Sequence, residues 1–157
     1  MMRVARLVPA LLLLLGACGR DEFEVLDPDR FHSVIPEGSS VRTLGVGLGF
    51  TEGPVWIDRD GGFLVFSDLW GGRLLKWSDG EGVVLFREAA NEPNGNALDR
   101  QGRLMTCEHA ARRITRTEAD GRVVLLADRF EGGRFNSPND LIVHSDGSVW
   151  FTDPTYG

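Results

Sequence analysis

The sequence predicts an all-β fold of the β-propeller class, and two overlapping sets of repeats predict it. A turn of the Asp-Gly type recurs at residues 58–61, 99–102 and 144–147, with its glycines 41 and 45 residues apart. A second set of turns, marked by Gly80 and Gly121, repeats after 41 residues. Two hairpins per repeat give four short strands in about 40 to 45 residues, which is the size of one propeller blade. The alternative is a β-sandwich or meander with chance turns.

Each turn lies between two apolar runs, and these runs are the expected strands. The first set joins run 55–57 to run 63–66, run 97–98 to run 103–105, and run 141–143 to run 148–151. The second set joins 74–77 to 83–86 and 114–116 to 123–126. A further short strand is expected over 41–48, where apolar residues alternate with Arg42, Thr43 and glycines.

The number of blades indicates part of a larger ring. From Glu52 to Gly157 the chain holds two full repeats and the inner hairpin of a third. Propellers typically close with four to eight blades. Residues 41–157 are therefore expected to be the N-terminal part of a truncated propeller.

The N-terminus has the pattern of an export signal. Arg3 and Arg6 precede a short apolar run, and the ending Leu-Gly-Ala-Cys resembles a bacterial lipobox. Residues 1–17 are thus a predicted lipoprotein signal peptide, Cys18 the lipidation site, and residues 18–40 a tether. The expected location is the bacterial cell envelope, anchored to the membrane by lipid on Cys18. The alternative is an ordinary secretory signal and a secreted protein.

Charge and cysteine content exclude some classes of protein. The formal charge is −6, and removal of residues 1–17 leaves 15 of the 17 basic residues against 23 acidic ones. Such a chain is not built to bind nucleic acid. With Cys18 lipidated, Cys107 has no partner for an intrachain disulfide, and it is expected to be a buried inert thiol. No obligate protein partner is evident.

Three polar residues share one position in the repeat. Glu52 lies in Phe-Thr-Glu-Gly-Pro-Val-Trp, nine residues before its turn glycine, while Asn94 and Asn139 lie eight residues before theirs. Because the first strand of a blade is innermost, these side chains are expected to converge on the central channel. A carboxylate and two carboxamides offer oxygen ligands, which suit a hard cation such as Ca²⁺, Mg²⁺ or Mn²⁺. The alternative is that the two asparagines only cap turns.

Polar residues also end the second strand of each unit. Because the chain reverses at each turn, they are expected on the rim of the propeller where the first strands begin. These are Asp68, the Glu108-His109 pair and Asp153, which could orient ligands, relay protons or simply cap strands. His109 is expected to be a satisfied rim residue rather than a catalyst. The sequence has no nucleophile elbow, phosphate loop or dinucleotide fingerprint, so hydrolysis would have to be assisted by a metal.

Three motifs together resemble the SMP-30/gluconolactonase/LRE-like family. They are 50–56, 98–104 with Cys107-Glu108-His109, and Asn-Ser-Pro-Asn-Asp-Leu at 136–141 with Trp-Phe-Thr-Asp-Pro at 150–154. The resemblance runs from about Phe50 to the end. It implies a six-bladed propeller with one divalent cation in its channel, acting on lactones or related esters. Ca²⁺ is the first choice, with Mg²⁺, Mn²⁺ and Zn²⁺ as alternatives.

The resemblance also assigns roles to residues. It carries metal ligands onto Glu52 and Asn139, and it makes Asn94, His109 and Asp153 candidates for substrate binding or channel lining. In the family a further Asn and an Asp, the proposed general base, come from later blades, so this chain alone is expected to be inactive. The alternative function is a non-catalytic propeller that binds a ligand or protein at the cell envelope.

Overall fold

The computed structural model describes residues 25–156, which divide at Arg42 into two compact units. The first unit contains one short helix, α1 (Pro28–His32), where the sequence predicted a tether. The Asp27 side chain caps it by accepting a 3.2 Å hydrogen bond from the Arg30 backbone N–H. The predicted signal peptide and Cys18 lie outside the described residues. Within residues 25–156, no helix is long and apolar enough to cross a membrane.

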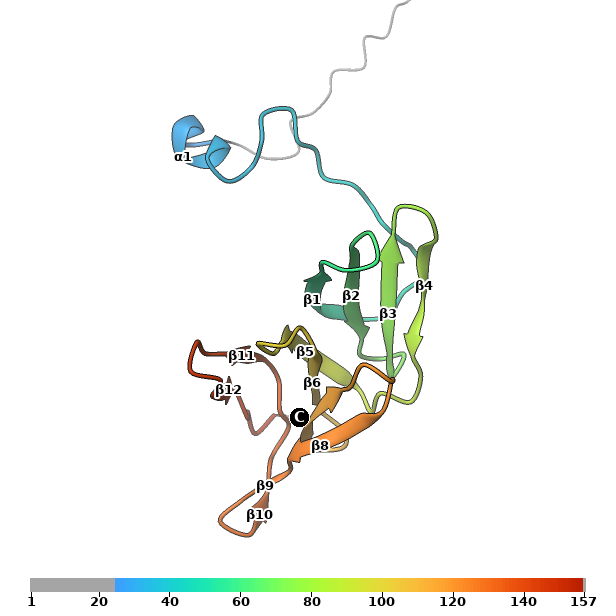
Figure 1. Ribbon diagram of the computed structural model, residues 1–157, viewed down its shortest axis with the longest axis vertical. Helices are drawn as coiled ribbons and strands as arrows, with labels where there is room; N and C mark the ends of the chain where they lie inside the picture. Colours follow the sequence, from blue (N-terminus) through green and yellow to red (C-terminus); the bar gives the residue numbers. More distant parts are fainter. Residues whose placement is uncertain (1–24, 157) are drawn as a thin grey trace, which may run out of the picture. The chain divides into compact units, whose positions relative to one another are not determined.

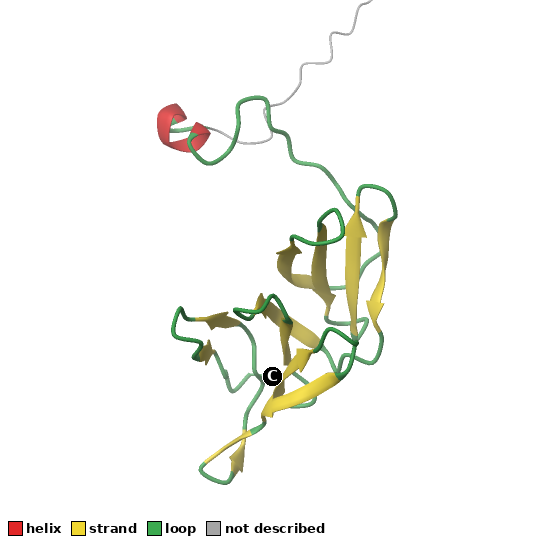
Figure 2. Ribbon diagram, viewed as in Figure 1, coloured by secondary structure: helices red, strands yellow, loops and turns green. Residues whose placement is uncertain are grey.

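The second unit, from Thr43 onward, is built from antiparallel strands (Figures 1 and 2). The first four-stranded sheet runs in the order β1 (Thr51–Ile57), β2 (Phe63–Asp68), β3 (Arg73–Ser78) and β4 (Gly82–Arg87). The second contains, also in order, β5 (Pro93–Leu98), β6 (Leu104–Glu108), β7 (Arg113–Thr117) and β8 (Val123–Ala127). A third hairpin pairs β11 (Leu141–Val143) with β12 (Val149–Phe151). The prediction of two four-stranded units and an inner hairpin is confirmed.

The repeated turns set the strand register as the sequence predicted. Ile57 pairs with Phe63, Leu98 with Leu104, and Val143 with Val149 across the three turns of the first set. The turn glycines Gly61, Gly102 and Gly147 have φ values of 88°, 73° and 93°, a region that glycine enters without steric cost. A small hairpin of β9 (Arg129–Phe130) and β10 (Gly133–Arg134), which the sequence analysis did not predict, follows β8.

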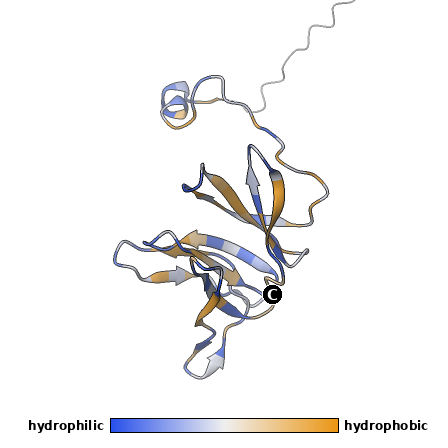
Figure 3. Ribbon diagram, turned by 45° about the vertical axis from the view of Figure 1, so that its right-hand side comes forward, coloured by the Kyte–Doolittle hydropathy of each residue, from blue (hydrophilic) through white to orange (hydrophobic). Residues whose placement is uncertain are grey.

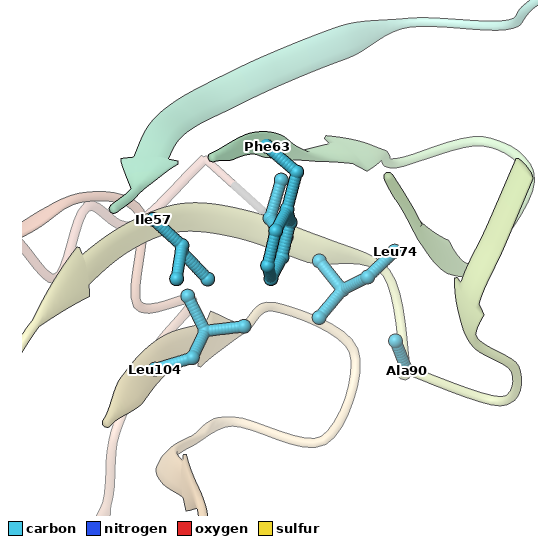
Figure 4. Packing of buried hydrophobic residues seen from close by; sticks show 6 residues of the cluster. Ile57, Phe63, Leu74, Ala90 and Leu104 are labelled. Atoms are coloured by element: carbon cyan, nitrogen blue, oxygen red, sulfur yellow. The ribbon is translucent and has the colours of Figure 1, made fainter. Parts of the chain in front are cut away.

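The apolar residues that alternate along the strands form two cores. The first contains Ile57, Phe63, Leu74, Ala90 and, from the second sheet, Leu104, so it lies between the two blades (Figure 4). The second core joins the second sheet to the third hairpin and is made of Met105, Cys107, Ile114, Phe135 and Leu141. Each large apolar side chain buried in this way contributes about 1.5–3 kcal/mol. Apolar residues concentrate on the strands, whereas the turns are largely hydrophilic (Figure 3).

The strand expected over 41–48 is wrong, because residues 25–50 contain no strand. Residues 43–48 instead lie along the first sheet as an irregular segment. Gly45 approaches Val83 so closely that a β-carbon there would lie 2.9 Å from its Cγ2, and Gly47 has a φ of 72°. The glycines that interrupt the apolar alternation therefore allow close packing on the sheet face rather than strand pairing.

The innermost strands of the two four-stranded sheets and of the third hairpin are neighbours. β5 packs against β1 and β2 on one side and against β11 on the other. The starts of these strands therefore lie side by side, and this arrangement positions the candidate site.

Candidate functional site

Glu52 and Asn94 lie at equivalent irregularities of two inner strands. The pairing of β1 with β2 shifts between Glu52 and Val55, and that of β5 with β6 shifts between Pro93 and Asn96. Such bulges bend a strand and redirect its side chains, and they are common beside active sites. Asn139 lies two residues before β11, and its backbone N–H donates a 2.9 Å hydrogen bond to the Thr152 carbonyl.

Backbone contacts bring these three positions together. The Gly95 N–H donates a 2.7 Å hydrogen bond to the Asn139 carbonyl, which joins the second unit to the third. A β-carbon at Gly53 would collide with the Asn94 carbonyl oxygen, and one at Gly95 would lie 2.6 Å from the Asp140 Cα. Both glycines are thus required for close approach, and Glu52, Asn94 and Asn139 lie on adjoining backbone segments. That their side chains converge on the channel stays a prediction.

A buried polar network fixes the backbone of Asn94. The Ser67 hydroxyl donates to the Asn94 carbonyl at 2.6 Å, and the Asn96 amide donates to Ser67 Oγ at 2.8 Å and to the Gly53 carbonyl at 2.9 Å. Thr106 completes the network by donating to Asn96 Oδ1 at 2.8 Å. The Asn94 side chain is only 2% exposed, yet its Oδ1 has no hydrogen-bond partner. The network therefore holds the residue while leaving a buried acceptor open.

The Glu52 carboxylate is in an electrostatically unfavourable setting. Partial burial raises its pKa above the ordinary value, the nearby negative charge of Asp140 raises it further, and His109 acts in the opposite direction. Within residues 25–156, its side chain forms no ion pair. A cation at this place would relieve the repulsion between the two carboxylates.

His109 is not the satisfied rim residue that the sequence analysis expected. It follows β6 directly, and its backbone N–H donates to the Glu92 carbonyl at 3.1 Å. Its Nδ1 is buried without a hydrogen-bond partner. Buried polar atoms are rarely left unpaired, so His109 and Asn94 are the two positions where a ligand is expected.

The carboxylates of the other rim residues are satisfied by hydrogen bonds from the protein itself. Asp68 accepts hydrogen bonds from Arg73, and Glu108 from both Arg87 and Arg113. Asp153 accepts 2.9 Å bonds from the backbone N–H groups of residues 136 and 137, which fixes the loop before Asn139. These bonds match the strand- and loop-capping alternative for Asp68 and Asp153. A channel-lining role for Asp153 stays a prediction.

Sequence reasoning missed two residues of this region. The negative charge of Asp140 raises the pKa of Glu52, and the Asn96 amide donates a hydrogen bond to Ser67 in the polar network. The signals were present, since Asp140 directly follows Asn139 and Asn96 lies two residues beyond Asn94. The Cys107 thiol is buried, and this burial raises its pKa, as expected for an inert cysteine.

The donor chemistry fits a hard cation. In the described part of the chain, no three His, Cys, Asp or Glu side chains come together as a metal site. A cation bound here would therefore have to use amide oxygens beside the Glu52 carboxylate. The open, buried Oδ1 of Asn94 is such an oxygen, and carboxylate with amide oxygens is the set that Ca²⁺ and similar ions prefer.

Comparison with known proteins agrees with this architecture. A curated gluconolactonase of Zymomonas mobilis is 30% identical over 142 residues, which cover 82% of this chain and 40% of that protein. A solved gluconolactonase of Xanthomonas campestris is 48% identical with a TM-score of 0.68, over 73% of this chain and 38% of the other. Another structure is 39% identical with a TM-score of 0.74, over 81% of this chain and 44% of the other. It was solved by the Northeast Structural Genomics Consortium and is provisionally described as a gluconolactonase.

The chain thus spans about two fifths of the length of these relatives. The sequence profile of the SMP-30/Gluconolactonase/LRE-like region matches residues 50–157, from the inner strand that carries Glu52 onward. The chain therefore belongs to the SMP-30/gluconolactonase/LRE-like family, and its sheets are blades of that family's β-propeller.

Proposed function

We propose that these residues form part of a lactonase that depends on a divalent cation, with Glu52, Asn94 and Asn139 contributing oxygen ligands. The observation that carries the proposal is the buried, unpartnered Oδ1 of Asn94, a residue whose backbone lies against Gly53, next to Glu52, whose pKa is raised. The lactonase activity is supported by relatives that are named gluconolactonases.

Each residue has a distinct part in this reaction. Glu52 supplies the negative charge that a hard cation requires, and Asn94 and Asn139 supply neutral oxygens. A divalent cation would polarise the lactone carbonyl and lower the pKa of water at the site. The Ser67–Asn96 network holds Asn94 in place, so little reorganisation is needed during the reaction. We expect the general base to come from a part of the protein outside these residues.

The Glu52→Gln variant of the complete protein tests this function. Gln keeps the shape and one oxygen but removes the charge, so affinity for Ca²⁺ and the rate of lactone hydrolysis should fall together by about tenfold or more. Stability without metal should hold or rise, because a poorly hydrated negative charge has been removed. Calorimetric Ca²⁺ titration and hydrolysis assays, each on wild type and variant, measure both effects. Unchanged Ca²⁺ dependence in the variant would exclude Glu52 as a ligand.

The rival function is a propeller that only binds a ligand at the cell envelope. The unpartnered polar atoms would suit such a role too, since they require a ligand but not a reaction. Metal-dependent cleavage of lactones by the complete protein separates the two functions. Binding of a lactone without cleavage, with and without Ca²⁺, would favour the rival.

We also propose that the protein is anchored to the cell envelope through lipid on Cys18. The support is the basic start, the short apolar run and the Leu-Gly-Ala-Cys ending of the sequence. Expressed in a bacterium, the precursor should incorporate labelled fatty acid and sediment with membranes, and Cys18→Ala should lose both properties. Equal labelling of the Ala variant would remove the lipoprotein proposal and leave a secreted protein.

A further inference from the structure

A carboxylate at the end of the second strand holds the incoming chain in each of the two sheets and in the third hairpin. The three carboxylates are those of Asp68, Glu108 and Asp153. The first accepts a 3.2 Å hydrogen bond from the Gly49 N–H through Oδ1, and the second accepts one of 2.9 Å from the Asn91 side chain through Oε2. The third accepts a 2.9 Å bond from the Asn136 N–H. Each held residue belongs to the connection that enters the first strand of the same repeat.

The held residue lies at the same distance along the chain from a candidate ligand in all three repeats. The spacing is three residues, from 49 to Glu52, from 91 to Asn94 and from 136 to Asn139. Three residues span at most about 11 Å even when fully extended, so fixing one end of such a segment limits where its other end can lie. The donor is a backbone N–H in two repeats and a side-chain amide in the other. The contact is therefore repeated although the residues that make it differ.

The connection into β5 has a backbone that needs to be held. Ala89, Asn91 and Glu92 have left-handed φ values of 48°, 55° and 53°. Residues other than glycine rarely adopt this conformation, and a segment that contains it persists when its surroundings impose it. Glu108 is 1% exposed and is fixed by its arginine partners, so it provides a rigid acceptor for the Asn91 side chain.

In the third repeat, a continuous set of hydrogen bonds leads from the carboxylate to the candidate ligand. Asp153 also accepts a 2.9 Å bond from the Ser137 N–H. Its neighbour Thr152 accepts a 2.9 Å bond from the Asn139 N–H, and the Asn139 carbonyl accepts the 2.7 Å bond from Gly95. The Asp153 carboxylate thus fixes the start of a segment whose end joins the second sheet.

We propose that Asp68, Glu108 and Asp153 are positioning residues, each of which fixes one oxygen ligand of the cation by holding the connection that carries it. They act through three residues of chain rather than on the cation or the substrate. The identity of the ligands rests on the proposed lactonase function. Partners that orient metal ligands affect metal affinity strongly, because a cation binds tightly where its ligands are already in place.

The first test uses Asp153→Ala in the complete protein, followed by amide hydrogen exchange without metal. The N–H groups of Gly95 and Asn139 should exchange about tenfold faster than in the wild type, because the segment between them and residue 153 is released. Ca²⁺ affinity, measured by calorimetry, should fall about tenfold or more. Asp153→Asn keeps one acceptor oxygen, so it should restore part of both properties.

The matched control for this test is Asp99→Ala. Asp99 also accepts two 2.9 Å bonds from backbone N–H groups, those of residues 101 and 103, in the turn that joins β5 to β6. This turn lies at the opposite end of the hairpin from the candidate ligands. A loss of stability alone would affect both variants alike, whereas release of Asn139 should occur only in Asp153→Ala.

The second test uses Asn91→Gly, which removes one side-chain bond and leaves the arginine pairs of Glu108 in place. Glycine adopts the left-handed φ of this position freely, so the connection is expected to fold. Ca²⁺ affinity should fall about tenfold, because Asn94 is no longer held. Glu131→Gly is the matched control, since Glu131 also has a left-handed φ, 48°, but lies in the turn between β9 and β10. Its Ca²⁺ affinity should equal that of the wild type.

The outcomes separate the positioning role from the proposed function. A wild type that binds no Ca²⁺ would refute the function, and the amide exchange would then decide the positioning alone. Exchange of Gly95 and Asn139 in Asp153→Ala that equals exchange in Asp99→Ala would overturn the positioning. Ca²⁺ affinity that stays at the wild-type value in both Asp153→Ala and Asn91→Gly would overturn it as well.

Discussion

Polar groups that lie near one another at one end of the inner hairpins differ in whether the protein satisfies them. Asp68 and Glu108, each 1% exposed, end β2 and β6 at equivalent positions. Each forms an ion pair with the arginine five residues later, Asp68 with Arg73 at 2.9 Å and Glu108 with Arg113 at 2.7 Å. Glu108 also binds Arg87 of the first blade at 3.0 Å, so it links two blades. These carboxylates belong to the scaffold.

A short distance away, polar atoms are buried without partners. Asn94 Oδ1 and His109 Nδ1 have none, and the Glu52 carboxylate has a raised pKa, from burial first and then from the negative charge of Asp140. Because an unpaired buried group lowers stability, a protein keeps one mainly where a ligand will satisfy it. The difference between saturated and open groups is therefore a physical criterion that separates scaffold from site.

The largest effect is expected when the scaffold is broken. Glu108→Gln should lower the free energy of unfolding by about 3–5 kcal/mol, because Arg87 is left buried and uncompensated. Asp68→Asn should cost less, since the Arg73 side chain is 41% exposed and can be hydrated, whereas that of Arg87 is 13% exposed. Urea unfolding of the complete protein measures both.

The control for these changes is Asp120→Asn, which breaks an exposed pair with Arg122 and should leave stability close to that of the wild type, because water hydrates both groups. A Glu108→Gln protein as stable as this control would contradict the scaffold role.

A smaller effect is expected from Gly95→Ala, which forces the inner strands apart. The added methyl would meet the Asp140 Cα and the Asn139 carbonyl, so stability should fall by about 1–3 kcal/mol and Ca²⁺ affinity should fall with it. Gly80→Ala is the matched control, because a β-carbon there meets nothing within 4 Å. Thermal unfolding and Ca²⁺ titration measure the two effects. Normal Ca²⁺ affinity in Gly95→Ala would show that Asn139 is not held by this contact.

A modest effect of opposite sign is expected when an open group is removed. His109→Leu installs the residue of the first blade, Leu69, and removes a buried unpaired nitrogen, so stability should hold or rise by up to about 1 kcal/mol. Lactone kcat/KM should nevertheless fall about tenfold or more. Thr106→Val is the contrast, because it breaks the 2.8 Å bond to Asn96 and should cost about 1 kcal/mol. Equal losses of stability in both variants would erase the distinction between site and scaffold.

The smallest effect is a pH dependence that Glu52 should give to the metal-free protein. Its pKa is raised above the ordinary 4.5, first by burial and then by Asp140, so the folded state binds this proton more tightly than the unfolded chain does. The stability that this proton adds is fully present below the pKa of Glu52 in the unfolded chain. It is lost as pH rises through the pKa of Glu52 in the folded protein. The free energy of unfolding of the wild type minus that of Glu52→Gln, measured at a series of pH values from about 4 upward, isolates this loss. Saturating Ca²⁺ should abolish it, and a wild type that gains stability relative to Glu52→Gln as pH rises would contradict the assigned shift.

The sequence alone determined the blades and their order. Its repeated turns and apolar runs fix which strands pair, because strand pairing across a short turn is local and the side-chain alternation has a period of two. For the same reason the repeat placed Glu52 and Asn94 on the inner strands of the two sheets and Asn139 just before the inner strand of the third hairpin. The one strand predicted outside the repeats, over 41–48, was wrong, because packing on a sheet face follows no such local pattern.

Only the tertiary structure decided which polar residues are satisfied. Nothing in the sequence distinguishes Glu108, bound by an arginine of another blade, from its neighbour His109, whose Nδ1 is left open. The same holds for Asp140, whose charge reaches Glu52 across two blades. Hydrogen-bond satisfaction and electrostatic repulsion depend on atoms brought together from distant parts of the chain, so they exist only in the folded molecule.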